Sequence, residues 1–455
     1  MCMLIKNGQV VLPNGVWQAD VLVRQGKIAA VSPGLKCDGA TVLDAGGCLV
    51  FPGFIDTHTH FDLELATATA ADDFVTGTKA ALLGGTTTVL DFATQQRDGT
   101  LQTALEQWHK KAQGSSCDYG FHMAIARWDA DVAAEIPRMT EQGVTSYKMY
   151  MVYDGLKMDD GAIYRALKYT RDKGCLIGMH CENWDLLLAM IEEQKALGHT
   201  DPTGHPASRP GPMEAEAVNR YLRLAELAKA PAYIVHLSTA QGLLEAELAR
   251  KRGQQVYLET CPQYLLLDDS RYADPDGAKF VMSPPLRKKE DNEALWAGLQ
   301  SAAIQTIGTD HCPFTMADKA LGKDDFSLIP NGGAGVQTRA QLIYTYGVLA
   351  GRITLPQMAQ LLSTNAASLF GMLPEKGAIV PGADADIVIW DPDHQEVLSH
   401  KTLAHHCDNT PFEGFPVQGY ARDVLLRGQH VVQNGTVVAP GKGQYVHRHP
   451  SGQIQ

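Results

Sequence analysis

The chain has 455 residues, of which 45% are hydrophobic and 20% are charged, as in an ordinary globular protein. This composition excludes a disordered, collagen-like or coiled-coil chain. Lys and Arg number 39 and Asp and Glu number 51, so the net charge is −12, which argues against nucleic acid or an anionic membrane surface as a partner.

Both ends of the chain predict short β-strands. Residues 1–50 and 377–455 alternate apolar and polar positions between turn signals such as Asn-Gly and Gly-Gly. The stretch GAIVPGADAD at 377–386 is expected to lead the chain back to its first strands. We therefore predict one small β domain from residues 1–50 and 377–455, beside a larger domain formed by residues 51–376.

The middle of the chain alternates apolar, strand-like runs with helical patterns. This alternation is typical of a parallel sheet whose two faces are both covered. We predict a parallel α/β barrel, with an open doubly wound sheet as the alternative, because no GxGxxG motif follows the first strand. A helix-rich insertion is expected at 183–230 and a last helix at 355–370. The eight predicted strands are residues 48–60, 86–93, 117–126, 144–151, 175–182, 232–238, 255–261 and 304–311.

Polar residues end five of the eight predicted strands. In a parallel barrel the carboxyl ends of the strands face one mouth, where active sites form. Four imidazoles and a carboxylate at one mouth have the composition of a metal site. The candidate ligands are His58 and His60 on the first strand, Lys148 on the fourth, His180 on the fifth, His236 on the sixth and Asp310 on the eighth.

Each of these residues also has a simpler interpretation. A single histidine at a strand end is more often a hydrogen-bonded structural residue. His311, which is next to Asp310, is expected to face away from it. Lys148 alone is most simply a lysine whose stem lies along apolar surface. The coincidence of four histidines at the ends of three strands favours the metal site.

Lys148 has a chemical role at such a site. Burial lowers the pKa of a lysine, and the neutral amine can take up carbon dioxide to form a carbamate. Like a carboxylate, the carbamate offers two oxygens and can bridge two metal ions, with a hydroxide nucleophile between them. The other ligands then divide into His58, His60 and Asp310 for one metal and His180 and His236 for the second.

Nine cysteines are scattered along the chain without a CxxC spacing, so no disulfide framework is predicted. The first residues lack the pattern of a signal peptide, and no apolar run is long enough to cross a membrane. We therefore expect a cytoplasmic protein in a reducing compartment.

Several motifs follow one another between residues 50 and 391: PGFIDTHTHFD, SYKMYMVY, ETCPQYLLLD, MSPPLR, GTDHCPF and GADADIVIWDP. With this ordered set the sequence resembles the cyclic amidohydrolases, in particular the dihydropyrimidinase/hydantoinase family. The resemblance implies a TIM (β/α)8 barrel with a β-sandwich from both termini. It also implies two divalent metal ions, expected to be Zn²⁺, an N6-carboxylated Lys148, and a homotetramer in which the C-terminal tail reaches a neighbouring subunit.

The resemblance implies that the six polar residues are the metal ligands, and that Tyr153, Ser283 and Asn331 bind the substrate, the last two largely through backbone groups. The implied reaction is hydrolytic ring opening of a cyclic ureide, a 5-substituted hydantoin or a dihydropyrimidine, to an N-carbamoyl amino acid by a metal-bridged hydroxide. In this reaction Tyr153 donates to the developing oxyanion. Asp310 carries the proton from the hydroxide to the leaving nitrogen.

Residues near the first strand predict which substituent the substrate carries. Dihydroorotases usually place an arginine two residues after HxH, where this chain has Asp62. Leu63, Leu65 and Tyr150 are expected around the exocyclic substituent and suit an apolar or aromatic group, although packing in the core explains each equally well. We therefore predict acceptance of 5-aryl or 5-alkyl hydantoins.

Two other functions compete with this one. Allantoinase also opens a hydantoin ring, but the CPQYLLLD and SPPLR blocks look more like dihydropyrimidinase. A non-catalytic tetrameric scaffold of the same family would lack metal ligands, whereas all six positions are filled here.

Overall fold

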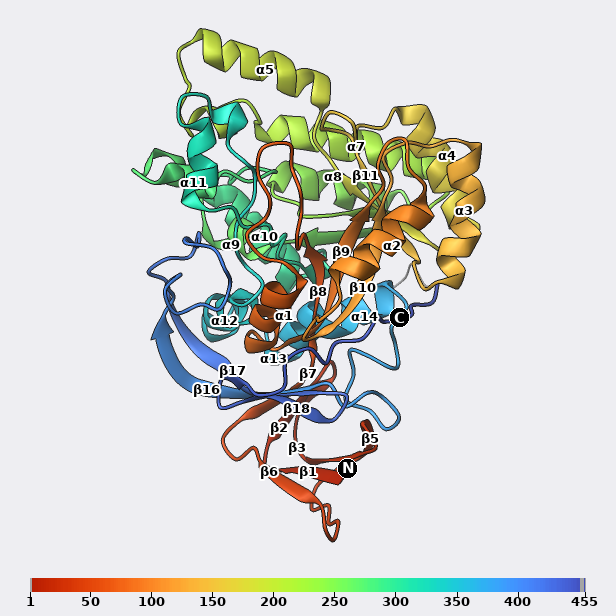
Figure 1. Cartoon of the computed structure of the whole chain (residues 1–455), viewed down its shortest axis with the longest axis vertical. Helices are drawn as coiled ribbons and strands as arrows, with labels where there is room; N and C mark the ends of the chain where they lie inside the picture. The colour runs from red at the N-terminus through yellow and green to blue at the C-terminus, as the bar shows by residue number, and fades with distance from the viewer. Residues whose placement is uncertain (1, 451–453, 455) are drawn as a thin grey trace.

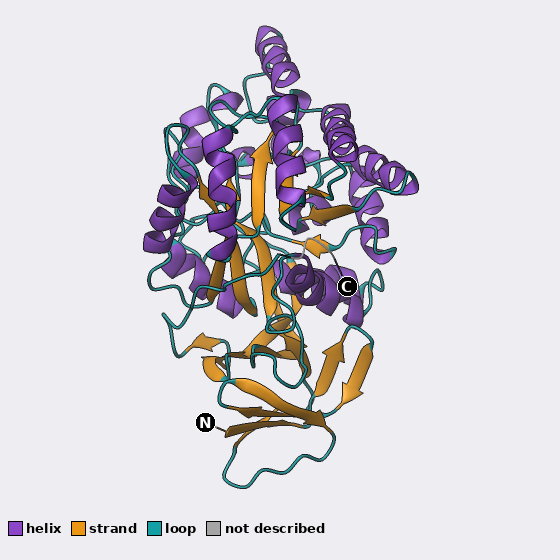
Figure 2. Ribbon diagram, turned by 90° about the vertical axis from the view of Figure 1, so that its right-hand side faces the viewer, coloured by secondary structure: helices purple, strands orange, loops and turns teal. Residues whose placement is uncertain are grey.

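The computed structural model describes residues 2–450 and 454. Figure 1 shows a barrel with its helices in the upper part and sheets from both termini below it. Turned by 90°, the barrel strands stand inside a layer of helices, as Figure 2 shows. Among the described residues, no helix is long and apolar enough to span a membrane.

All eight predicted barrel strands are present and form one parallel sheet, ordered β15-β14-β13-β12-β11-β10-β9-β8. The prediction of a parallel barrel is therefore confirmed, and the open doubly wound sheet is excluded. The strands are β8 Phe54–Thr59, β9 Thr86–Thr94, β10 Asp118–Ala124, β11 Ser146–Tyr150, β12 Leu176–His180, β13 Ala232–Ile234, β14 Val256–Thr260 and β15 Thr306–Ile307.

Helices cover the outside of the barrel, and several of them begin at side-chain caps. Asp73, Asp129 and Asp159 each accept a hydrogen bond from the first turn of the helix that follows. The insertion after β12 and the helix before the C-terminal strands lie where they were predicted. The helices are α1 Phe74–Leu83, α2 Leu101–Lys111, α3 Ala130–Glu141, α4 Asp160–Arg171, α5 Trp184–Ala196, α6 Gly204–Ala207, α7 Gly211–Ala228, α8 Ala240–Lys251, α9 Pro262–Leu266, α10 Lys289–Gln300, α11 Met316–Lys319, α12 Arg339–Ile343, and α13 Leu355–Ala359 and α14 Asn365–Leu369, which a π-helical segment at Gln360–Thr364 joins.

One backbone bridge and several side-chain hydrogen bonds close the barrel where its first and last strands meet. A single backbone bridge joins Thr59 to His311. The Asp56 carboxylate accepts hydrogen bonds from the Thr309 amide at 3.1 Å and the Thr309 hydroxyl at 2.7 Å. The fully buried Arg339 donates to the carbonyls of Ile55 and Ile307, both at 2.8 Å. This closure sets the end of β8 directly beside Asp310.

Strands from both termini form two further sheets with a shared apolar core. Ile5 and Val21 from one sheet pack with Val50 and Ile387 from the other, as expected for a β-sandwich. The exact boundaries of the two domains stay a prediction. The four-stranded sheet is β5 Lys27–Ser32, β4 Asp20–Arg24, β1 Cys2–Lys6 and β6 Thr41–Asp44; the seven-stranded sheet is β19 Thr436–Val437, β18 Gln429–Gln433, β17 Pro416–Leu426, β16 Ile387–Val397, β7 Leu49–Pro52, β2 Gln9–Leu12 and β3 Gly15–Gln18.

The C-terminal tail lies against the barrel of its own chain. The Val446 amide donates to the Tyr119 carbonyl at 2.7 Å, and the Tyr119 amide donates to Gln444 at 3.0 Å. Arg448 is fully buried and donates to the Ser146 hydroxyl at 2.7 Å. The stretch 444–448 is thus held by contacts within its own chain. The contact of the tail with a neighbouring subunit stays a prediction, and residues 451–453 and 455 lie outside the described residues.

Candidate active site

The six predicted ligands meet at the carboxyl end of the barrel. One oxygen of Asp310 lies 3.1 Å from His58 Nε2 and 3.2 Å from His60 Nε2. The ring of His236 is 5.2 Å from that of His58 and 4.5 Å from that of His180, measured between centroids. Residues far apart in sequence therefore form one cluster, because the parallel strands all end at the same mouth.

The donor atoms of this cluster suit a divalent metal ion. His58, His236 and Asp310 each offer a ligand atom, and these atoms lie within 4.8 Å of one another. Among their ring nitrogens, His236 Nδ1 is buried without a hydrogen-bond partner, and the buried His58 Nε2 faces only an Asp310 oxygen at 3.1 Å. A buried nitrogen without a partner is costly, and a metal ion between these atoms would satisfy it. Imidazole and carboxylate donors match zinc and related ions.

Lys148 lies among apolar and aromatic groups at the same mouth. Its side chain is 1% exposed, and its Nζ lies 4.9 Å from the Phe92 ring centroid and 5.3 Å from that of Tyr150. Burial lowers the pKa of Lys148 to about 8, although the carboxylates of Asp310 and Glu259 oppose this. Compared with an exposed lysine, Lys148 therefore has a larger share of the neutral amine, which is the form that reacts with carbon dioxide.

Two buried glutamates, which the sequence analysis did not identify, orient the histidines. Glu259 lies 2.6 Å from His58 Nδ1, so this ring donates there and leaves Nε2 for a metal. Glu182 lies 2.6 Å from His180 Nε2 and 3.0 Å from Arg209. Burial opposes ionisation of Glu182, but Arg209 and His180 hold its pKa well below the usual value. Their positions in the sequence could have identified them: Glu182 stands two residues after His180, and Glu259 lies near the end of a barrel strand.

Two carboxylates lie beside the His58 ring and change its pKa. Burial by itself lowers the pKa of His58, but the carboxylates of Glu259 and Asp310 raise it to about 8. The pKa of Asp310 lies well below its usual value, because His58 and His60 outweigh the effect of burial. Asp310 is therefore a carboxylate, able both to bind a cation and to accept a proton.

Three residues of the site have a strained backbone conformation. Tyr153, His236 and Asp310 have positive φ angles of 77°, 39° and 54°. This left-handed region is uncommon for residues other than glycine, and such strain gathers at functional sites. The conformation turns each side chain at the point where its strand has just ended.

The predicted substrate-binding residues differ in how close they lie to the candidate metal ligands. The Tyr153 ring lies 5.1 Å from that of His180, and the buried Tyr150 ring lies 5.9 Å from that of Tyr153. Burial raises the pKa of both phenols, so both hold their protons and can donate hydrogen bonds. In the loop after β8, Leu63 packs instead on the cluster of Ala70, Cys312 and Phe314, and Leu65 is 41% exposed.

Ser283 and Asn331 come from two loops that reach the same region. A small enclosed cavity beside Asp310 is lined by Met282 and Gly333, the neighbours of these loop residues, together with Gln263, Thr309, Ala334 and Pro411. Ser283 is buried, and its hydroxyl has no hydrogen-bond partner. The loops thus bring backbone groups close to the candidate metal ligands.

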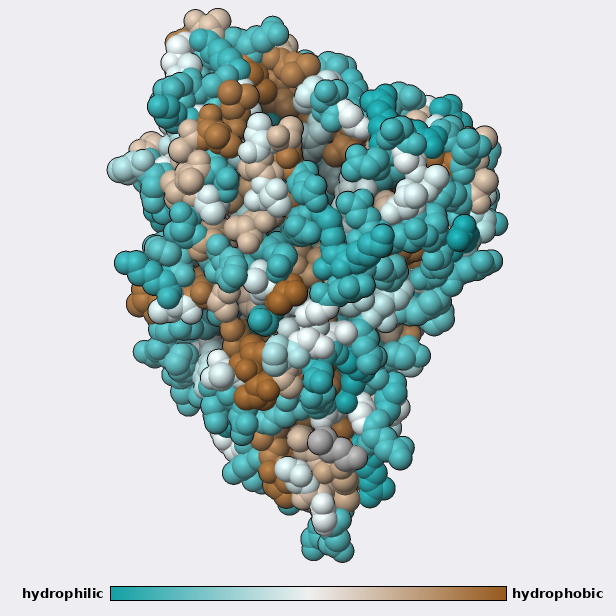
Figure 3. Space-filling view, viewed as in Figure 1, coloured by the Kyte–Doolittle hydropathy of each residue, from teal (hydrophilic) through white to brown (hydrophobic). Residues whose placement is uncertain are grey.

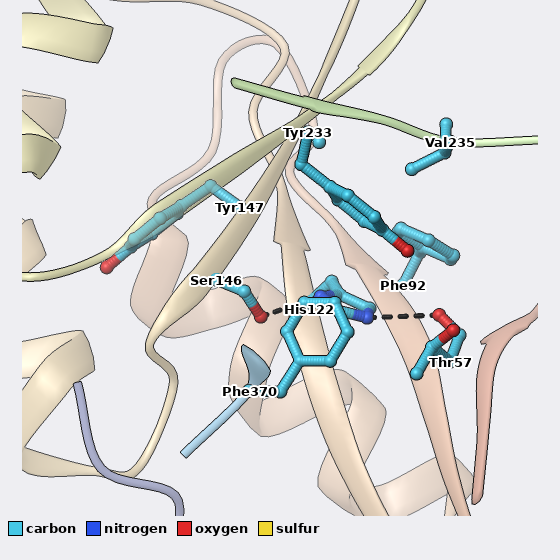
Figure 4. A pocket seen from close by; sticks show the side chains of 9 residues that line it. Thr57, Phe92, His122, Ser146, Tyr147, Tyr233, Val235 and Phe370 are labelled. Carbon is cyan, nitrogen blue, oxygen red and sulfur yellow. Dashed lines mark hydrogen bonds between the residues drawn. The ribbon is translucent and has the colours of Figure 1, made fainter. Parts of the chain in front are cut away.

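Other histidines serve the framework. His311 lies 3.0 Å from Asp72 and accepts from the amides of Gly335 and Val336, so it faces away from Asp310 as predicted. His122 lies in the barrel interior between Ser146 and the Thr57 carbonyl, at 2.6 and 3.1 Å, as Figure 4 shows. The Phe92 ring stacks on both His60 and His122 and so joins this layer to the site above it.

Fold and site together define an α/β-barrel protein with a candidate metal-dependent active site at the carboxyl ends of its strands. Residues 49–431 match the model of the Amidohydrolase family, and the chain belongs to this family.

Known proteins resemble the chain along nearly its whole length. It is 45% identical to the D-hydantoinase of Geobacillus stearothermophilus, over 98% of this chain and 97% of that protein. It is 41% identical to the D-phenylhydantoinase of Escherichia coli O1:K1 / APEC, over 99% of both. The crystal structure of dihydropyrimidinase from Brevibacillus agri NCHU1002 matches with a TM-score of 0.97 at 41% identity, over 99% of both chains.

Proposed function

We propose that this protein opens cyclic ureides by hydrolysis, taking 5-substituted hydantoins and dihydropyrimidines to N-carbamoyl amino acids. The observation that carries the proposal is the cluster of four histidines, Lys148 and Asp310 at one barrel mouth, in a chain whose relatives are named D-hydantoinase, D-phenylhydantoinase and dihydropyrimidinase. These names favour hydantoin or dihydropyrimidine rings over allantoin.

The proposed cofactor is a pair of divalent metal ions, with zinc as the first choice and an N6-carboxylated Lys148 between them. Such ions polarise a carbonyl and acidify water, so that a hydroxide nucleophile is available at neutral pH. The unpartnered Nδ1 of His236, the Nε2 of His58 that faces the Asp310 carboxylate, and the low pKa of Asp310 support this assignment. The six proposed ligands are His58, His60, Lys148, His180, His236 and Asp310.

The side chains of the site have defined tasks in the proposed reaction. The Tyr153 hydroxyl donates to the oxygen that becomes negative when the ring carbonyl is attacked. Asp310 accepts the proton of the nucleophile and returns it to the ring nitrogen that leaves. Ser283 and Asn331 are proposed to bind the ureide edge, largely through their backbone groups. Tyr150, Leu63 and Leu65 are proposed to surround the exocyclic substituent.

The proposed function is tested by ring opening with the zinc-reconstituted protein. Dihydrouracil and racemic 5-phenylhydantoin are assayed side by side, and product is measured as the N-carbamoyl amino acid. We expect turnover of both, faster for phenylhydantoin, because Tyr150 lies beside Tyr153 in an aromatic part of the site. A strict requirement for unsubstituted dihydrouracil would contradict the proposed contact of Tyr150 with the exocyclic substituent. Turnover of neither substrate would contradict the proposed function, and allantoin is then the next substrate to assay.

Glu259 is expected to control metal affinity through His58. In the Glu259→Gln variant the carboxylate that holds Nδ1–H is lost, and zinc affinity is expected to fall about 10- to 100-fold. Competition with a chromogenic chelator measures this affinity, with Glu293→Gln as the control because Glu293 lies on the surface, paired with Arg352. Equal zinc affinity in the Glu259→Gln variant and the wild type would contradict the role of Glu259.

A homotetramer in the cytoplasm is also proposed. Figure 3 shows apolar side chains gathered near the top of one face, over α5 and the segments beside it. Leu186 and Leu188 of α5 are 46% and 42% exposed, which supports a contact between subunits. All nine cysteines lie in the part of the chain that the structure describes and form no disulfide there, although the Sγ atoms of Cys2 and Cys37 lie 3.1 Å apart. A reducing compartment is proposed on the scattered spacing of the cysteines.

A further inference from the structure

Lys319, at the end of α11, is a buried lysine whose ammonium group is surrounded by backbone carbonyls. The residue is 1% exposed. Its Nζ donates hydrogen bonds to the carbonyl of Val281 at 2.8 Å, of Pro330 at 2.6 Å and of Gly332 at 2.8 Å. Burial lowers the pKa of Lys319 to about 7. The three carbonyl acceptors favour the ammonium form, because it has three N–H donors and a neutral amine has only two.

No carboxylate within the described residues lies at ion-pair distance from Lys319 Nζ. A buried lysine normally has such a partner, because removing a cation from water is costly. The three carbonyls must therefore replace the hydration of the ammonium. An apolar side chain would fill this space without that cost, so the charge and its three directed donors are what distinguish lysine at this position.

The three carbonyls belong to the two loops that carry the proposed substrate contacts. Val281 stands two residues before Ser283, and Pro330 and Gly332 flank Asn331. The Gly332 amide also donates to the Val281 carbonyl at 3.0 Å, so the loops are bonded to each other beside the lysine. Met282 and Gly333 continue from this junction to the wall of the cavity at Asp310.

A second buried side chain, on the insertion after β12, donates a hydrogen bond to the junction of these two loops. His205, in α6 of the insertion, lies with Nε2 2.8 Å from the Met282 carbonyl. Burial lowers the pKa of His205 to about 3, so the ring is neutral and Nε2 donates as N–H. Consecutive carbonyls at residues 281 and 282 are thus bound from two directions, by Lys319 and by His205.

We propose that Lys319 is a positioning residue for the cyclic ureide: its ammonium holds the loops at 281–283 and 330–332 together, so that the backbone groups of Ser283 and Asn331 meet the ureide edge opposite Asp310. This inference rests on the proposed function. Lys319 touches neither substrate nor metal in this arrangement and acts through the two loops.

Steady-state kinetics of the Lys319→Met variant test the proposal. Loss of the charged donors is expected to raise KM for 5-phenylhydantoin by about tenfold or more. The turnover number is expected to stay within about threefold of the wild type, because the loops contact the ureide equally before and during the reaction. Zinc content per chain is expected to be unchanged. Lys323→Met is the matched control, because Lys323 lies on the same segment with its side chain 75% exposed.

Hydrogen exchange separates loop positioning from general destabilisation. In Lys319→Met, peptides that cover 278–286 and 328–335 are expected to exchange faster while the barrel strands do not. His205→Leu removes only the donor to Met282 and is expected to raise KM less; it serves also if Lys319→Met fails to fold. Unchanged exchange in both loops, or a loss of turnover and zinc with KM unchanged, would overturn the proposal. Failure of the wild type to open either ring would instead overturn the proposed function, and the exchange comparison still decides whether Lys319 holds the two loops.

Discussion

Replacing Asp310 with asparagine is expected to lower ring opening by about 10³-fold or more, because the amide cannot accept and return the proton. Asparagine keeps the size of the side chain and an oxygen in nearly the same place. The Asp310 carboxylate lies 3.1 Å from His58 and 3.2 Å from His60, so the exchange tests proton transfer with little change in shape. Turnover of 5-phenylhydantoin at saturating substrate measures the effect.

Metal content must be measured on the same sample, since Asp310 is also a proposed ligand. An Asp310→Asn protein that binds zinc as the wild type does and turns over at a comparable rate would refute proton transfer by Asp310. Asp172→Asn is the matched control: this carboxylate lies on the surface just after α4, 59% exposed beside Arg171, outside the candidate ligand cluster. Its turnover is expected to match the wild type.

The barrel and the clustering of the candidate ligands could be predicted because both follow from local sequence patterns. A run of apolar residues that ends in His58-Thr59-His60 or in His180 marks a buried strand and its polar end. Parallel strands then carry those ends to one mouth without further information.

The supporting groups could not be predicted because each depends on a contact between distant segments. Glu259 meets His58 across 201 positions, and Asp56 meets Thr309 across 253. A lone buried acid or lysine has no periodic pattern in sequence, so Lys319 was indistinguishable from a surface residue. The exposure of Leu65 was equally hidden, because the course of the loop after β8 is set by its own backbone pairing, from the Leu65 amide to Ala68 at 2.8 Å.

Replacing Lys148 with methionine is expected to remove most ring-opening activity, about 10³-fold or more, because the ions lose the anion proposed to lie between them. Methionine matches the length of the lysine stem and suits contacts with Phe92 and Tyr150, so folding is expected to persist. Elemental analysis is expected to find fewer zinc ions per chain than in the wild type. Lys168→Met, on the exposed face of α4, is the control.

Reloading the metal-free wild type distinguishes a carbamate from an unmodified lysine. The buried amine of Lys148 forms a carbamate only if carbon dioxide is present, so zinc in carbon dioxide-depleted buffer is expected to restore little activity. Added bicarbonate is expected to restore it in the wild type and to have no effect on Lys148→Met. In Lys148→Ala, a short carboxylic acid such as propionate is expected to recover part of the activity, since it places a carboxylate in the space left by the side chain. Full recovery of the wild type without carbon dioxide would exclude the carbamate while leaving the ring-opening function itself intact.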